Sequence, residues 1–181
     1  MPTLRPLLAL AAIALPAAVV ADRALASRRG PRPLAPLRML EVVEAPIEAT
    51  WAILSDIPLQ PAWMAEMKSV RLLTSGPVAA GTRGEATVRI LGVSVTDEVT
   101  VTEFEPPVLF GVRHEGLVTG GGELRLEAGT DGTTTIVRWE ETLVAPFLPD
   151  LAAAVAGPIL RAVFQADLRR LKALVEAPGV E

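Results

Sequence analysis

The chain has 181 residues, of which half are hydrophobic, with a net charge of −4 and a sequence pI of about 5.2. Outside its N-terminal arginines this acidic chain has no basic stripe, so we expect it to bind no nucleic acid. It has no cysteine, which excludes disulfides and cysteine-ligated zinc, and its single histidine excludes a metal site built from several histidines. We therefore expect no metal and no cofactor.

Residues 1–27 form a hydrophobic segment that is either a membrane anchor or a secretory signal. Its apolar run extends from Leu7 to Ala21, which is short for a spanning helix of about 20 residues. Residues 24–26 resemble a signal cleavage site, but Asp22 and Arg23, which lie between this site and the apolar run, disfavour cleavage. Both interpretations remain open at this point.

Arginines next to this segment predict its orientation. Arg5 precedes the apolar run, whereas Arg23, Arg28, Arg29 and Arg32 follow it. This bias favours a cytoplasmic location for the downstream side. We expect a protein that is associated with the membrane through this segment, with a cytoplasmic domain; the alternative is export after cleavage. Three prolines make residues 28–37 an extended Arg/Pro-rich linker, and residues 38–177 then form one domain.

The domain begins with a short strand and two short helical segments. Residues 37–44 have a strand-like composition, and Pro46 suits the first turn of a helix over 47–55. Residues 60–64 indicate a second helical turn.

Six further strands are predicted, each separated from the next by a turn that contains glycine or proline. Short turns of this kind join antiparallel neighbours. The predicted strands cover residues 69–74, 83–91, 93–104, 109–115, 123–128 and 133–144.

After Pro149 the hydrophobic period changes to that of a helix of about 26 residues, with a bend expected at Gly157-Pro158. Asp167 is assigned to its polar side. Because the sheet and this helix carry the only large apolar faces, we predict an α+β fold in which they cover each other. The predicted apolar stripe of the helix consists of Leu151, Val155, Ile159, Val163, Leu168, Leu171 and Val175.

The order and spacing of several short motifs resemble the SRPBCC or START-like superfamily, close to its polyketide cyclase/dehydrase and lipid-transport group. The resemblance covers roughly residues 38–176 and implies a helix-grip fold, a curved antiparallel sheet around a long C-terminal helix with an apolar cavity between them. It implies no particular reaction, because the superfamily includes carriers, cyclases, hydroxylase domains and sensors. The matching stretches are residues 45–51, 54–56, 61–63, 76–77, 81–82, 104–107 and 132–134, Trp139, and residues 167–172.

Strand alternation predicts one ionisable side chain on each of three strands pointing into this cavity. Asp97, His114 and Glu141 each share the phase of apolar neighbours, and antiparallel pairing places all three toward one end of the sheet. Two carboxylates around an imidazole would raise its pKa and supply candidate catalytic acid-base groups. The alternatives are that Asp97 reaches water at a bulge, that His114 bonds a loop, and that Glu140 is the inward residue.

A set of apolar and aromatic side chains is expected to contact the ligand. For Trp63 the alternative is a core position, and we expect residues 116–122 to form a mobile loop with an apolar lip at Leu117 and Val118. The ligand-binding candidates are Trp63, Met64, Val95, Val99, Phe110, Val112, Trp139 and Phe164.

The sequence thus favours a module that binds, and possibly transports, a hydrophobic small molecule such as a lipid or polyketide. A cyclase or dehydratase that uses His114 with Asp97 or Glu141 is the alternative. A third interpretation is a regulatory domain that binds a protein partner.

Overall fold

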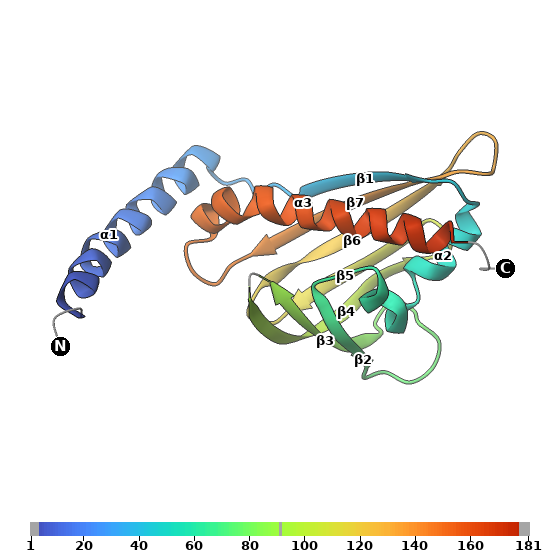
Figure 1. The fold of residues 1–181 in the computed structure, drawn as a ribbon, viewed down its shortest axis with the longest axis horizontal. Coiled ribbons are helices and arrows are strands. Elements are labelled where there is room, and N and C mark those ends of the chain that lie inside the picture. Colours follow the sequence, from blue (N-terminus) through green and yellow to red (C-terminus); the bar gives the residue numbers. More distant parts are fainter. Residues whose placement is uncertain (1–3, 91, 178–181) are drawn as a thin grey trace.

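The computed structural model describes residues 4–90 and 92–177, and the side chains of 14–89 and 92–177. Helix α1 (Leu4–Arg29) projects from one end of the domain, where its C-terminal part contacts the start of the long C-terminal helix (Figure 1). It is longer than its apolar run, because the helix continues through the arginines that follow. Residue 91, the last of one predicted strand, lies outside the described residues.

A seven-stranded antiparallel sheet forms the body of the domain, in the order β1-β7-β6-β5-β4-β3-β2. Neighbours along the chain are paired from β2 to β7, as the short turns predict. β1 closes the far edge by pairing with β7. The strands are β1 (Leu37–Val43), β2 (Met67–Leu72), β3 (Arg83–Ile90), β4 (Val93–Glu105), β5 (Leu109–Glu115), β6 (Thr119–Ala128) and β7 (Thr135–Val144).

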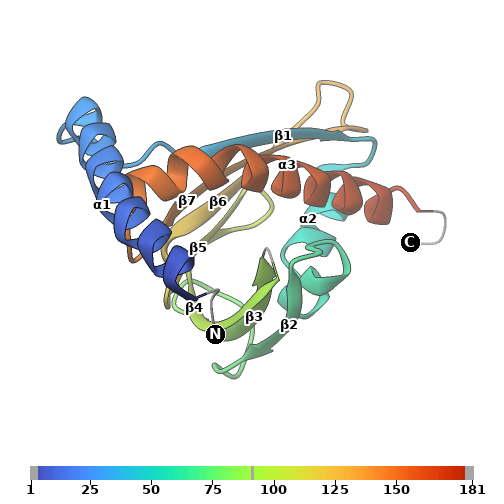
Figure 2. The same ribbon diagram turned by 60° about the vertical axis from the view of Figure 1, so that its left-hand side comes forward.

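Helix α3 (Pro149–Val175) lies along the concave side of this curved sheet, as Figures 1 and 2 show from two directions. Helix α2 (Ile47–Leu54) and the 3-10 helix η1 (Ile57–Ala62) cover the end of the sheet that is distant from α1. The C-terminal half of α3 packs on these elements and on the sheet through Leu168, Leu171 and Val175. The α+β helix-grip fold predicted from the sequence is confirmed.

The predicted loop at residues 116–122 is wrong in extent, because β6 begins at Thr119 and includes three consecutive glycines. Gly120, Gly121 and Gly122 pair with β5 on one side and β7 on the other. A glycine-rich sequence predicts a loop. Here the absence of side chains instead leaves space for atoms of the adjacent strands β5 and β7. Only residues 116–118 form the turn.

The apolar stripe predicted for α3 is correct for the C-terminal half and wrong for the N-terminal half. Val155 and Ile159 are exposed, whereas the inward face there consists of Ala152, Ala153 and Ala156. A spacing of four residues drifts around a helix of 3.6 residues per turn, so a strict i, i+4 series leaves the buried face. Asp167, assigned to the polar side, is buried with 1% of its surface exposed.

By length and composition alone, one helix among the described residues, α3, could cross a membrane. The buried half of α3 lies in the core of the domain. The N-terminal half of α3 is apolar enough to count as a possible span because the run from Leu151 to Leu160 contains no charged residue.

Candidate functional site

A cavity of about 460 Å³ lies between α3 and the concave face of the sheet. Its walls are mainly apolar, and seven of the eight predicted ligand contacts line it: Met64, Val95, Val99, Phe110, Val112, Trp139 and Phe164. The cavity exists because the part of α3 that faces it carries alanines and a glycine, which are too short to reach the sheet.

Trp63 does not line this cavity among the described residues. It is 1% exposed and packs edge-on against Trp139, with ring centroids 6.3 Å apart. The structure therefore places Trp63 in the core, and Met64, the next residue, faces the cavity.

His114 and Glu141 form a hydrogen-bonded pair on the cavity wall. His114 Nε2 lies 3.0 Å from Glu141 Oε1, and the Trp139 indole N–H donates to Glu141 Oε2 at 3.0 Å. Both oxygens of this buried carboxylate are thus paired, which fixes the imidazole. Glu140, the alternative inward residue, is exposed and pairs with Arg38.

Gly122 lies opposite Glu141 in the ladder and leaves space for its side chain. A Cβ at Gly122 would lie 2.2 Å from Glu141 Oε2 and 3.3 Å from Trp139 Nε1. A side chain at this position would therefore displace the Glu141 carboxylate from its place beside His114.

The pKa of His114 is raised above its ordinary value of 6.5 by its partners. Burial by itself lowers this pKa, but the hydrogen bond and charge of Glu141, with the charge of Asp97, outweigh the loss of solvation. These partners therefore favour the protonated ring, which can donate a hydrogen bond.

Asp97 lines the cavity but does not bond the imidazole. Its two carboxylate oxygens accept from the backbone N–H of Leu117, each at 3.2 Å. The bulge in β4 lies at 101–103, so Asp97 sits in regular pairing opposite Ala86. The predicted cluster is therefore a His114–Glu141 pair, with Asp97 holding the adjacent turn.

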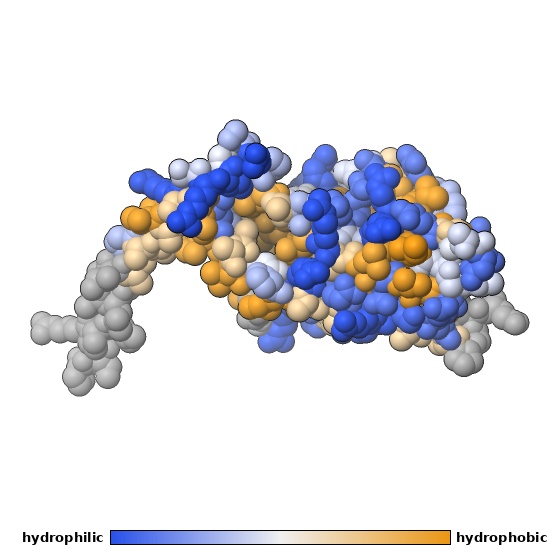
Figure 3. All heavy atoms as spheres, turned by 90° about the horizontal axis from the view of Figure 1, so that it is seen from above, coloured by the Kyte–Doolittle hydropathy of each residue, from blue (hydrophilic) through white to orange (hydrophobic). Residues whose placement is uncertain are grey.

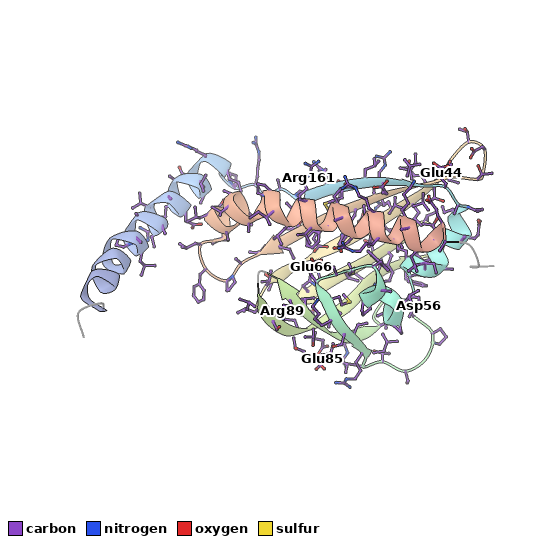
Figure 4. All side chains as sticks on the ribbon, in the orientation of Figure 1. Glu44, Asp56, Glu66, Glu85, Arg89 and Arg161 are labelled. Atoms are coloured by element: carbon purple, nitrogen blue, oxygen red, sulfur yellow. The ribbon has the colours of Figure 1, made fainter. Side chains whose placement is uncertain are left out.

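A second polar group on the wall was missed from the sequence. Asp167 accepts from the backbone N–H of Ala65 at 3.0 Å and from Arg170, and Glu66 lies beside it at the start of β2, beneath α3 (Figure 4). Burial raises the pKa of Asp167 to about 6; the bonds from Ala65 and Arg170 oppose this, and Glu66 adds to it. The signal was available, because Asp167 lies three residues after Phe164 and four before Leu171, both buried.

Comparison with known proteins agrees with this geometry. Residues 39–176 match the family described as polyketide cyclase / dehydrase and lipid transport. The chain belongs to this family. A search of curated protein sequences gave no match.

Solved structures of other proteins share the fold of this polyketide cyclase / dehydrase and lipid-transport family member. A protein of Thermus thermophilus is 17% identical, with a TM-score of 0.65 over 80% of this chain and 99% of its own. The Zhui aromatase/cyclase of a Streptomyces species is 18% identical, with a TM-score of 0.60 over 80% of this chain and 97% of its own. At these identities the likeness shows the fold alone.

Proposed function

We propose that this chain binds a hydrophobic small molecule with one polar end, such as a lipid or a polyketide, in the cavity beneath α3. The observation that carries the proposal is the cavity itself, about 460 Å³ with mainly apolar walls. This volume lies within the range of small-molecule sites, which combine apolar walls with a few polar groups that fix orientation.

The polar end of the ligand is held by His114. Because Nε2 faces Glu141, the other ring nitrogen, Nδ1, is the one available to a ligand, and it makes no hydrogen bond to the described residues. A protonated ring donates from Nδ1, so the matching ligand group is an acceptor such as a carbonyl, carboxylate or phosphate oxygen.

We further propose that α1 anchors this domain at a membrane, on its cytoplasmic side, close to where apolar ligands dissolve. The support is the apolar run from Leu7 to Ala21 within α1, which rises roughly 22 Å and can enter a bilayer, and the arginines that follow it at the C-terminal end of the helix.

Photolabelling tests the binding proposal. The full chain in lipid nanodiscs is irradiated with a fatty acid that carries a diazirine, and labelled peptides are identified by mass spectrometry. We expect label on β4 and β7, and a loss of severalfold in Ala156→Phe, because the added ring occupies part of the cavity. Ala162→Phe adds the same group on the exposed side of α3 and is the matched control. Equal labelling of β4 and β7 in both variants would contradict the proposal.

A cyclase-type reaction is the second candidate, and the His114–Glu141 pair favours it. The imidazolium could donate its Nδ1 proton to a ketone oxygen while Glu141 holds the ring. The related fold of an aromatase/cyclase agrees with such chemistry. With a tetraketide thioester as probe, whose chain is long enough to close a six-membered ring by an aldol reaction, an enzyme would consume it above the buffer rate, and His114→Ala would lose that excess at least tenfold. A carrier would show no excess, and His114→Ala would change its photolabelling by only a few-fold.

A further inference from the structure

The open end of the cavity is lined by chain segments that meet at one end of the domain. The start of β4, the β5–β6 turn and the segment before β1 contribute Val93, Leu117 and Leu34 to its wall. Val93 and Leu117 line the cavity and are also exposed to solvent, which indicates that the cavity opens at this end. The registers Ile90↔Val93, Glu115↔Thr119 and Thr119↔Val144 place these turns at the same end of the sheet. α1 and the start of α3 lie at this end too (Figure 2).

Large apolar side chains at this end are exposed to solvent. Phe147, in the segment between β7 and α3, is 81% exposed, and Leu117 is 56% exposed. On the outward side of α3, Val155 is 65% exposed within the run that contains no charged residue. Figure 3 shows hydrophobic residues gathered where α1 meets this end of the domain. Exposed apolar surface of this extent indicates a partner.

A polar clasp fixes α1 to the start of α3. Arg29 donates to both carboxylate oxygens of Asp150, at 2.7 and 3.1 Å, and Asp22 accepts from the backbone N–H of Leu151 at 2.9 Å. Asp22 thereby satisfies one of the unpaired N–H groups at the N-terminus of α3. The orientation of α1 therefore sets the orientation of the cavity mouth.

Charge at this end selects the kind of partner. Arg23, Arg28 and Arg32 are exposed, with no acidic partner among the described residues. Among the acidic side chains nearby, Glu140 pairs with Arg38 and Glu115 pairs with Arg113, whereas Asp97 accepts from the backbone N–H of Leu117. An apolar surface beside unpaired arginines is complementary to a bilayer that contains anionic lipids.

We infer that the mouth of the cavity docks on the lipid bilayer, with Phe147, Leu117 and the outward face of α3 entering its interface. This inference rests on the proposed membrane location of α1 and adds that the domain itself touches the lipid. A ligand then passes between acyl chains and cavity without crossing water.

The absence of cysteine allows a direct test, because each labelled site can be the only thiol. Phe147→Cys and Leu117→Cys place an environment-sensitive NBD fluorophore at the mouth. Thr130→Cys places it in the exposed β6–β7 turn, at the opposite end, as the matched control. The full chain is reconstituted in vesicles of phosphatidylcholine and phosphatidylglycerol, with or without lipids that carry a nitroxide on the acyl chain.

We expect blue-shifted emission at 147 and 117, and quenching by nitroxide lipid at least threefold stronger than at 130. Equal quenching at the three positions would overturn the inference. A blue shift without lipid quenching would also overturn it, because a second copy or another protein would then cover the mouth.

The role of the clasp is tested by removing the ion pair between Arg29 and Asp150. In Arg29→Gln the chain should stay in the vesicles through α1, while quenching at 147 falls at least twofold; unchanged quenching would show that the clasp does not set the orientation. Photolabelling of β4 and β7 reports ligand binding separately, so either proposal can fail while the other stands.

Discussion

At the scale of single residues, the pair of His114 and Glu141 follows from strand alternation, but its hydrogen bonds do not. The period of two puts Asp97, His114 and Glu141 on the inner face, where the structure has them. Which carboxylate reaches the imidazole depends on register and on Gly122, neither of which the spacing alone specifies. Asp97, equally placed by phase, instead binds the turn at Leu117.

The variant Glu141→Gln should lower the pKa of His114 below its value in the unmodified chain. Burial, which lowers that pKa, remains in the variant, whereas the charge of Glu141 that outweighs it is removed. NMR titration reads this directly, since the chain has one histidine. Asp97→Asn should lower the pKa less, because Asp97 makes no bond to the ring. An unchanged pKa in Glu141→Gln would show that the pair does not form in solution.

The raised pKa of His114 makes the stability of the folded chain depend on pH. The stabilisation from protonated His114 beside Glu141 is fully present below the unfolded value of 6.5 and is lost as the pH rises through the folded pKa.

At the scale of elements, glycines decide where side chains fit. Gly122 in β6 leaves room for a carboxylate, whereas Gly157 in α3 has ordinary space, since a Cβ there would lie 3.6 Å from Leu37 Cδ2. The sequence shows glycine in both places and indicates a loop for the first and a bend for the second. The structure has a paired strand at the first position, and at the second position the helix continues from Pro149 to Val175.

These two glycines should respond oppositely to alanine. Gly122→Ala should lower the free energy of unfolding by about 1–3 kcal/mol, because the added methyl displaces Glu141. Gly157→Ala should raise it by about 0.5–1 kcal/mol through helix propensity. Urea unfolding measures both changes. A neutral Gly122→Ala would mean that the strand relaxes without cost.

At the scale of the whole molecule, Asp167 joins α3 to the segment after η1 across one side of the cavity. It bonds Ala65 and Arg170, and Arg170 also donates to the carbonyl oxygen of Trp63 at 3.0 Å. Its pKa of about 6 means that the folded chain holds a proton that the unfolded chain releases near 3.8. This contribution to stability is therefore full below about pH 4 and is lost as the pH rises through about 6.

Asp167→Asn should remove that pH dependence. The shift corresponds to roughly 3 kcal/mol before screening, and we expect about 1–2 kcal/mol because Arg170 is open to solvent. Measured by urea unfolding from pH 4 to 7, the unmodified chain should lose this stability relative to the variant. Asp56→Asn, which changes an exposed carboxylate directly before η1, is the control. Parallel curves for Asp167→Asn and the unmodified chain would contradict the assignment.

The sequence by itself determined the order of the elements, the antiparallel sheet and the inward face of three of its strands. These follow from local periods and turn residues, which neighbouring positions along the chain specify. Only the tertiary structure decided that the N-terminal half of α3 turns alanines inward and Val155 outward, that Asp167 is buried, and that α1 is clasped beside the cavity mouth. Each of these features depends on contacts between residues that are distant in sequence. The cavity depends on the absence of contacts between the alanines of α3 and the sheet.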